Sequence, residues 1–321
     1  MPTPLLPTFD DVLAAAARIA PHAHATPVLR SSALDTLAGC HLHFKAEPLQ
    51  RSGAFKFRGA CNAVWALDDA TATRGVVTHS SGNHGAALAL AARTRSIACH
   101  VVVPEGANAA KLANIARYGA TLHRCAATIE AREAAAARVE AETGASLIHP
   151  YTHPHVIAGQ GTAALELLNA QGPLDALVAP VGGGGLLSGT AITAAATAPD
   201  CHIIGAEPEG AADTADSLAA GERRVDFVPD TLCDGLRGTL GEPNFALLRT
   251  YAVDVVTVPD ADTLAAMRLL WQCLKLLVEP SSAIALAAIL RHPGRFAGQR
   301  VGVVLSGGNV DLAALPWERA A

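Results

Sequence analysis

The stretch that decides the fold is VGGGGLLSG at residues 181–189, which directly follows the apolar run 176–180. The run predicts a buried strand, and residues 188–197 predict the helix behind it. Four consecutive glycines lose much backbone entropy on folding, so we expect a ligand to approach the bare backbone closely here. Free N–H groups at the positive end of a helix dipole suit a phosphate. The alternative is a flexible hinge.

The phosphate expected at this loop does not belong to a nucleotide. The loop lacks the Gly-Lys-Ser/Thr ending of a nucleotide-binding P-loop. It also lacks a proper G-x-G-x-x-G pattern with an acidic residue placed to bind a ribose. A smaller phosphorylated ligand therefore remains.

The composition is typical of a large cytoplasmic protein. Half of the 321 residues are apolar, enough to bury a core in two lobes. A net charge of -5 gives no basic footprint, so we expect no nucleic-acid partner. Seven scattered cysteines without a C-x-x-C pair predict reduced thiols. The start MPTPLLPTFDD lacks a signal-peptide pattern, and no apolar stretch nears roughly 18 residues, so we expect no membrane contact.

Short apolar runs alternate along the chain with longer, alanine-rich segments of helical periodicity. This alternation predicts an α/β protein with parallel sheets that carry helices on both faces. The expected strands are residues 75–78, 98–103, 121–124, 146–149, 176–180, 202–206, 254–258 and 300–305. The expected helices are residues 86–93, 109–118, 129–143, 161–170, 188–197 and 261–277.

Three of the expected strands run into loops rich in glycine or serine. The loops are HSSGNHG at 79–85, VGGGGLLSG at 181–189 and SGGNVD at 306–311. Ligands of open α/β sheets bind outside the carboxyl ends of the strands, so we expect these loops to converge. Ser80, Ser81, Asn83 and His84 precede a helix whose free N–H groups suit a carboxylate. The alternatives are three unrelated turns and simple N-capping.

Lysine is rare in this chain, with four among 24 basic residues. One of them, Lys56 in SGAFKFRGA, lies between Phe55 and Phe57. Apolar surroundings lower the pKa of an amine and leave more of it as the neutral nucleophile, a role that arginine cannot fill. The alternative is a lysine that snorkels from a helix start. A phosphate cradle, such an amine and a carboxylate site together suggest pyridoxal phosphate and an amino-acid substrate.

At this point the chain resembles the fold-type II pyridoxal-phosphate enzymes, and within them the serine racemase / serine-threonine dehydratase family. The resemblance spans roughly residues 20–312 and rests on seven motifs in register: SGAFKFRGA, SSGNHG, GQGTAALE, VGGGGLLSG, AEP, VEPSSA and LSGGNVD. It implies a two-lobed α/β fold similar to the tryptophan synthase β subunit, and a homodimer. A large cofactor-binding domain would comprise residues 1–67 and 152–321, and an inserted small substrate-binding domain residues 68–151.

The resemblance also implies how the cofactor is held. Lys56 would form a Schiff base with the cofactor, and Phe55 would pack against its ring. Asn83 would hydrogen-bond the 3′ oxygen, and Ser306 would face the pyridine nitrogen. The phosphate would lie on Gly182, Gly183, Gly184, Gly185 and Leu186. A serine does not force protonation of the pyridine nitrogen, so the cofactor is a weaker electron sink, which suits elimination from the β-carbon.

The implied activity is dehydration of L-serine and L-threonine to a 2-oxo acid and ammonia, with serine racemase activity. Ser80, Asn83 and His84 would bind the substrate carboxylate. Lys56 would take the α-proton on one face of the substrate. Ser81 would act on the opposite face, where serine racemases protonate the carbanion and invert the centre.

A divalent-cation site is implied by the segment AEPEGAAD at residues 206–213. Glu207, Asp213 and the carbonyl of Ala211 correspond to the metal ligands of the racemase-like subgroup. Two carboxylates and a carbonyl are hard oxygen ligands that suit Mg²⁺ or Ca²⁺. The alternative is a solvated acidic loop.

Three residues bear on the choice of substrate. Tyr151 stands where the racemases we compare tend to carry a small amide, and Thr239 becomes the substrate-contacting hydroxyl. Arg132 matches an arginine that approaches the distal end of the substrate, which makes 3-hydroxyaspartate an alternative substrate. An exposed arginine on a helix face is the other interpretation of Arg132.

Two further alternatives stay open for the function as a whole. The first is β-replacement, as in cysteine synthase, and the second is an amino-acid or phosphate sensor without catalysis. The histidine of SSGNHG, the Glu207/Asp213 pair and the VEPSSA stretch favour the dehydratase branch.

Overall fold

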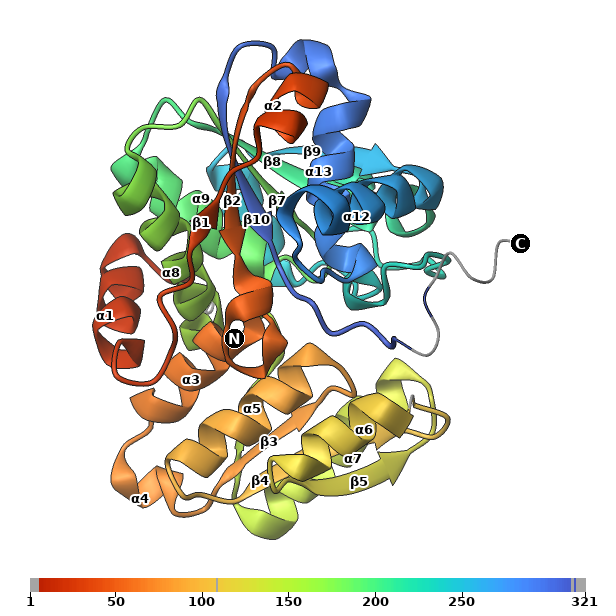
Figure 1. The fold of residues 1–321 in the computed structure, drawn as a ribbon. Helices are drawn as coiled ribbons and strands as arrows, with labels where there is room; N and C mark the ends of the chain where they lie inside the picture. The colour runs from red at the N-terminus through yellow and green to blue at the C-terminus, as the bar shows by residue number, and fades with distance from the viewer. Residues whose placement is uncertain (1–5, 108, 313–314, 316–321) are drawn as a thin grey trace.

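The chain folds into two β-sheets, one above the other in Figure 1, each covered by helices. The computed structural model describes residues 6–107, 109–312 and 315 of the chain. Within these residues one sheet has six strands and the other has four. The α/β architecture that the alternating sequence pattern predicts is confirmed.

The larger sheet joins the two ends of the chain. Its order is β1-β2-β10-β7-β8-β9, and every neighbouring pair is parallel except β1 and β2. Its strands are β1 (Val28–Leu29), β2 (His41–Ala46), β7 (Ala176–Pro180), β8 (His202–Pro208), β9 (Asp254–Val258) and β10 (Arg300–Leu305). Because β2 pairs with β10 along its whole length, residues near the start of the chain lie beside residues near its end.

The smaller sheet is built from one continuous part of the chain. Its order is β5-β4-β3-β6, and all its pairs are parallel. Its strands are β3 (Val76–His79), β4 (Cys99–Pro104), β5 (Thr121–Cys125) and β6 (Ser146–Leu147). All four lie inside residues 68–151. The exact domain boundaries stay a prediction.

The central strands of both sheets are buried on two faces, which explains why strands such as β3, β7 and β10 are largely apolar runs. In the smaller sheet Val76 and Val101 pack against α5 (Asn83–Thr94), whereas Val77 and Val102 pack against α7 (Ile129–Thr143). The larger sheet shows the same division. On one face of it, a cluster contains Val178 and Val303 with α13 (Pro280–Arg291). On the other face, a cluster contains Leu177 and Val304 with α8 (Pro154–Gln171) and α9 (Gly185–Thr197).

Of the six expected helices, α6 (Ala109–Arg117), α7 and α12 (Asp260–Leu274) begin within one residue of the expected start, and the other three start earlier. The expected starts of α5, α8 and α9 at residues 86, 161 and 188 were wrong. The remaining helices are α1 (Phe9–Ile19), α2 (Ser32–Ala38), α3 (Lys56–Ala66), α4 (Asp69–Ala72), α10 (Asp213–Ala220) and α11 (Glu242–Thr250). These helices and α13 were not expected.

The starts of α8 and α9 were expected too late because their glycines suggest a loop. In the structure these glycines belong to two helices that pack closely against each other. A Cβ added to Gly161 of α8 would stand 2.8 Å from the Gly189 oxygen of α9. A Cβ added to Gly189 would stand 2.5 Å from the Gly161 nitrogen. The glycines therefore allow two helix backbones to touch, and no turn is needed at either position.

Strand β2 was not among the expected strands, although its sequence HLHFKA alternates polar and apolar residues, the pattern of a half-buried strand. Yet His43 and Lys45 are 2 % and 1 % exposed. Each has a polar partner from a distant helix: His43 Nδ1 lies 2.8 Å from Gln171 Oε1, and Lys45 Nζ lies 2.5 Å from Glu166 Oε2. These polar side chains can be buried because residues more than 100 positions away in the chain supply their hydrogen-bond partners.

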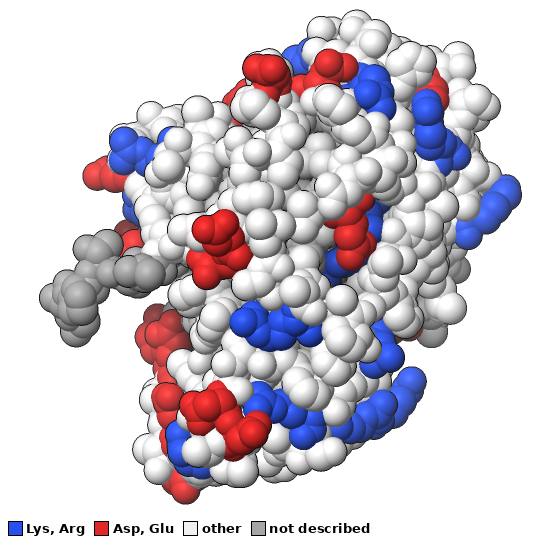
Figure 2. Space-filling model, turned by 90° about the vertical axis from the view of Figure 1, so that its left-hand side faces the viewer, with Lys and Arg blue, Asp and Glu red and all other residues white. Residues whose placement is uncertain are grey.

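The surface carries both signs of charge. On the face in Figure 2, acidic and basic side chains are interspersed and form no continuous field of one sign. None of the helices in the described residues is long and apolar enough to cross a membrane. All seven cysteines lie in the described part of the chain, where each is a free thiol.

Candidate active site

A cavity of about 1790 Å³ lies at the carboxyl ends of β3, β7 and β10. All three of the loops expected to converge line it, at residues 79–84, 182–186 and 306–311 in part. Lys56 and Phe55 line it as well. The structure therefore brings the glycine-rich loop, the serine-rich loop and the buried lysine to one place.

Lys56 is the first residue of α3 and points into this cavity. Its Nζ donates to the Pro150 oxygen at 3.0 Å and lies 5.2 Å from the centre of the Phe55 ring. Burial lowers the pKa of the Lys56 amine to about 8. At pH 7 about a tenth of such an amine is neutral, against roughly three parts in ten thousand at an ordinary lysine pKa. Lys56 thus has the chemistry of a nucleophile and a base.

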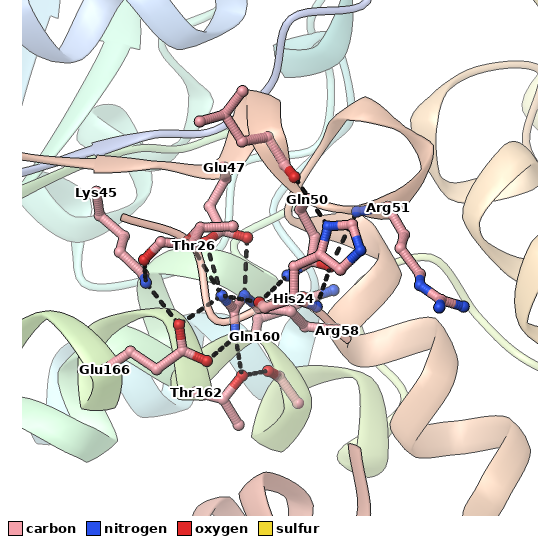
Figure 3. A network of polar contacts seen from close by, with 12 residues as sticks. His24, Thr26, Lys45, Glu47, Gln50, Arg51, Arg58, Gln160, Thr162 and Glu166 are labelled. Carbon is pink, nitrogen blue, oxygen red and sulfur yellow. Dashed lines mark hydrogen bonds and ion pairs between the residues drawn. The ribbon is translucent and has the colours of Figure 1, made fainter. Parts of the chain in front are cut away.

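The helix that starts with Lys56 is held by the buried ion pairs in Figure 3. Arg58 donates to both oxygens of Glu47 at 2.7 and 2.8 Å, and to both oxygens of Glu166 at 2.7 and 2.8 Å. Arg58 and Glu47 are 0 % exposed. Lys45 completes the network through Glu166, so strand β2, the 3-10 turn η1 (Glu47–Leu49), α3 and α8 are bound to one another. This network fixes where α3 begins.

The four glycines leave no room for side chains. A Cβ on Gly183 would stand 2.4 Å from the Tyr151 ring, and one on Gly182 would stand 2.8 Å from the Leu236 Cα. Gly184 has φ +92° and precedes α9 without a side-chain cap. The glycines of the loop therefore place no side chain of their own over the backbone N–H groups at the start of α9. A phosphate fits such a cradle.

Asn83, the first residue of α5, is oriented by two neighbours. Its Nδ2 donates to Glu279 Oε1 at 2.8 Å, and its Oδ1 accepts from Asn309 Nδ2 at 2.9 Å. Burial raises the pKa of Glu279 to about 7, while Lys111 and Asn83 oppose that shift. Glu279 and Asn309 were not among the expected site residues. Both stand inside the motifs VEPSSA and SGGNVD, which were the only sequence signal for them.

The residues expected to bind a substrate differ in accessibility. Ser80, Ser81 and Thr239 line the cavity. His84 is 2 % exposed, its Nε2 lies 3.3 Å from the Ile148 oxygen, and its Nδ1 is buried without a partner in the described residues. Burial, followed by the charge of Lys56, lowers the pKa of His84 well below its usual value, so the ring is neutral.

Arg132 and Ser306 complete the expected set around the cavity. Arg132 donates from Nη2 to the Ala127 oxygen at 3.2 Å, while its Nε is buried and has no partner among the described residues. Ser306 is 3 % exposed, and its Oγ donates to the Ser281 oxygen at 3.4 Å. The Ser306 oxygen also accepts from the Phe55 N–H at 2.9 Å, which ties the lysine segment to the loop after β10.

The expected metal ligands lie outside the cavity lining. Glu207 is 0 % exposed and accepts from the N–H groups of Thr214 and Ala215 at 3.0 and 2.9 Å. Asp213 accepts from the Leu240 N–H through Oδ2, whereas its Oδ1 is buried without a partner in the described residues. Burial raises the pKa of Glu207 to about 8 and that of Asp213 to about 6. The unpartnered Asp213 oxygen is a hard ligand of the kind that Mg²⁺ or Ca²⁺ binds. The described residues hold no group of three or more His, Cys, Asp or Glu side chains that could bind a metal ion.

A comparison with protein families gives one match across most of the chain. The model of the pyridoxal-phosphate dependent enzymes matches residues 19–307. This chain belongs to that family. The cofactor of the family is pyridoxal phosphate, and the glycine cradle and the Lys56 amine fit it. The expected fold class, a two-lobed α/β enzyme of fold type II with parallel sheets, is confirmed.

Individual relatives narrow the branch of the family. A β-hydroxyaspartate dehydratase of Paracoccus denitrificans is 48 % identical over 312 residues, covering 97 % of this chain and 99 % of the relative. A serine racemase of Dictyostelium discoideum is 46 % identical and covers 96 % of each chain. The solved structure of a threonine deaminase from T.th. has a TM-score of 0.90 and 43 % identity over 95 % of this chain and 99 % of that one. This chain is thus similar to dehydratases, deaminases and racemases of amino acids.

Proposed function

We propose that this enzyme removes water from L-serine and L-threonine, giving a 2-oxo acid and ammonia, and that it also racemises serine. The observation that carries the proposal is the meeting of Lys56 and Ser81 in one cavity beside the glycine cradle. We assign the base at the start of α3 and the hydroxyl in the loop after β3 to opposite faces of one substrate. Relatives named serine racemase and threonine deaminase support the same chemistry.

Bound pyridoxal phosphate supplies an electron sink for the bond that breaks at the substrate α-carbon. Gly182 to Leu186 would hold its phosphate, and Asn83, Ser306 and Phe55 would surround its ring. The neutral Lys56 amine takes the α-proton. Ser81 returns a proton on the other face when the product is the enantiomer. The α-carboxylate lies at the start of α5, near Ser80 and Asn83, where free backbone N–H groups bind an anion.

A second candidate substrate is 3-hydroxyaspartate, and Arg132 favours it. The Arg132 side chain lines the cavity, and none of the ion pairs among the described residues includes it. A guanidinium without a carboxylate partner suits the second carboxylate of a substrate. A relative named β-hydroxyaspartate dehydratase adds support.

A panel of amino acids tests the proposal. The wild-type holoenzyme is given both enantiomers of serine and threonine, and the threo and erythro forms of 3-hydroxyaspartate. The 2-oxo acid and the enantiomer of the remaining substrate are measured together. We expect 2-oxo acid from L-serine and L-threonine, and D-serine from L-serine. Cysteine formed from O-acetylserine and sulfide, with no 2-oxo acid from any member of the panel, would replace the proposal by β-replacement.

The substitution Ser81→Ala is expected to separate the two activities. D-serine formation and elimination from D-serine should fall by about 10²-fold or more, because the proton donor on that face is lost. Elimination from L-serine should stay within about tenfold, since Lys56 acts on the other face. Ser80→Ala is the matched control and should raise KM for both enantiomers together. An equal loss of all activities in Ser81→Ala would refute the facial assignment.

We also propose that Glu207, Asp213 and the Ala211 carbonyl hold Mg²⁺ or Ca²⁺. The unpartnered Asp213 oxygen and the raised pKa values of both carboxyls support a cation there. Because the cation needs carboxylates and these groups hold protons up to about pH 6 and 8, its affinity should rise with pH across that range. Because its ligands lie outside the cavity lining, the cation would stabilise the folded structure and would not contact the substrate.

Chelation is the test of this cation. EDTA should lower Tm or activity of the wild type, because a cation that binds only the folded state stabilises it by mass action. Mg²⁺ or Ca²⁺ should restore the loss. Glu207→Ala should remove the response to EDTA while keeping bound cofactor. If EDTA changes neither Tm nor activity of the wild type, there is no such site.

The homodimer and the cytoplasmic location stay predictions.

A further inference from the structure

The segment of residues 149–152 forms a wall of the cavity beside Lys56. The Pro150 oxygen accepts from Lys56 Nζ at 3.0 Å, and the Tyr151 oxygen accepts from Asn244 Nδ2 at 3.0 Å. The Tyr151 ring covers Gly183 of the glycine cradle. His149 and Tyr151 both line the cavity. A side chain on this wall therefore faces whatever lies between the lysine and the cradle.

Two backbone N–H groups determine the tautomer of His149. Those of Tyr151 and Thr152 lie 3.4 and 3.2 Å from His149 Nδ1, which accepts from them. A neutral imidazole that accepts at Nδ1 carries its hydrogen on Nε2. Burial, then the charges of His79, Lys56 and His153, lowers the pKa of His149 to about 3. The ring is thus an uncharged Nε2–H donor at any physiological pH.

The orientation of that donor is fixed by its neighbours. The His149 ring stands edge-on to His79, with centres 5.0 Å apart and planes at 72°, and edge-on to Tyr151 at 4.6 Å and 87°. Its Nε2 has no hydrogen-bond partner among the described residues and is not one of their buried unpartnered atoms. The donor is therefore open to the cavity and has little freedom to turn.

The charged and helix-start groups of the cavity leave the β-hydroxyl of a substrate to the neutral groups of the lining, among them Thr239 and His149. The start of α5 suits the α-carboxylate, and the guanidinium of Arg132 suits a second carboxylate. A β-hydroxyl is uncharged and needs a donor that does not attract an anion in its place. A neutral imidazole that cannot take a proton near pH 7 meets that requirement, and it binds the hydroxyl without acting as an acid.

We propose that His149 donates a hydrogen bond from Nε2 to the β-hydroxyl oxygen of the substrate, and so selects β-hydroxy amino acids over those that lack the hydroxyl. The inference rests on the proposed function, since it assigns a residue to the hydroxyl that the enzyme would remove. All of the candidate substrates carry this group. A site with a donor for a hydroxyl discriminates against the ligand without it, because the donor is then left unpaired.

Three variants of the holoenzyme test this role. His149→Phe removes both nitrogens. His149→Asn keeps an acceptor for the N–H groups of Tyr151 and Thr152 but has no donor at the Nε2 position. His149→Gln can restore a donor there. Each protein is titrated with L-serine and with L-alanine, and binding is followed by the absorbance change of the bound cofactor. Tm is measured for each variant.

The wild type should bind L-serine more tightly than L-alanine. This preference should fall about tenfold in His149→Phe and in His149→Asn, with L-alanine affinity changed less than about twofold, the loss of roughly one hydrogen bond. His149→Gln should keep the preference to within about threefold. A structural role alone would lower Tm and weaken both ligands together. An unchanged preference in His149→Asn, or no preference in the wild type, would overturn the proposal.

The titration separates this inference from the proposed function. Binding requires no turnover, so the preference for L-serine can be measured even if the wild type releases no 2-oxo acid. In that case the dehydratase proposal fails, and the titrations still decide the role of His149. If His149→Phe does not fold, His149→Asn gives the same answer, because its side-chain oxygen replaces Nδ1 as the acceptor within the loop.

Discussion

Lys56→Ala should yield a colourless protein without activity. The wild type, when loaded with pyridoxal phosphate, should show a visible absorbance band, and the variant should lack it because no amine remains to bind the cofactor covalently. Elimination from L-serine should fall by at least about 10³-fold, because the base for the α-proton is lost as well. Absorbance spectra and 2-oxo acid assays measure both effects.

Two matched variants make the Lys56 result specific. Lys56→Arg keeps the positive charge but cannot supply a neutral amine, and it should behave like Lys56→Ala. Lys275→Ala removes an exposed lysine at the end of α12 and should keep the band and the activity. A band of full strength in Lys56→Ala would contradict the role assigned to this lysine, whatever the activity. It would direct attention to Lys111, which also lines the cavity.

The largest effect on stability is expected from Arg58→Met. The substitution leaves the fully buried Glu47 carboxylate without its partner, and removing one member of a buried pair costs about 3–5 kcal/mol of unfolding free energy. Urea denaturation and Tm measure the loss. Because Arg58 does not line the cavity, we expect the loss of unfolding free energy to be larger than any direct effect on the reaction.

Arg30→Met is the control for this prediction. Arg30 also pairs with a carboxylate, that of Asp35 at 3.2 Å, but its side chain is 50 % exposed. Exposed pairs contribute about 0–1 kcal/mol, so the control should lose little. If both variants lost the same small amount, the buried network would be no more than a packing arrangement. A Tm that falls only in Arg58→Met supports it as the anchor of the helix that carries Lys56.

The fold could be predicted where a strand is buried on both faces. Strands β7 and β10 have the expected bounds, since an apolar run between two helical layers needs no other signal. The edge strand β9 is only partly buried, and its run of valines was signal enough for its bounds. The burial of strand β2 could not be predicted, because Lys45 and His43 are buried with Glu166 and Gln171 as their partners. Local sequence holds no trace of partners that distant.

The candidate site divides in the same way. The glycine cradle and Asn83 stand in motifs whose spacing signals a loop and a helix start. His149 stands in no such motif, since its meaning depends on the N–H groups of the next residues and on the ring of His79. Glu279 likewise gains its importance from contact with Asn83, 196 positions away in the chain. Sequence motifs predict local backbone structure such as loops and helix starts. Contacts between side chains that are distant in the sequence become visible only in the folded structure.

The pairing of β2 with β10 has a consequence for biosynthesis. The smaller sheet is complete once the ribosome has made Leu147, whereas the larger sheet must wait for Leu305. At 5–20 residues per second this is a delay of roughly 8 to 30 s. Throughout it Phe44 and Lys45, destined for the interior, have no strand β10 to cover them. The nascent chain therefore carries an unprotected strand edge at residues 41–46 until Leu305 has been added, and this is where a chaperone would be needed.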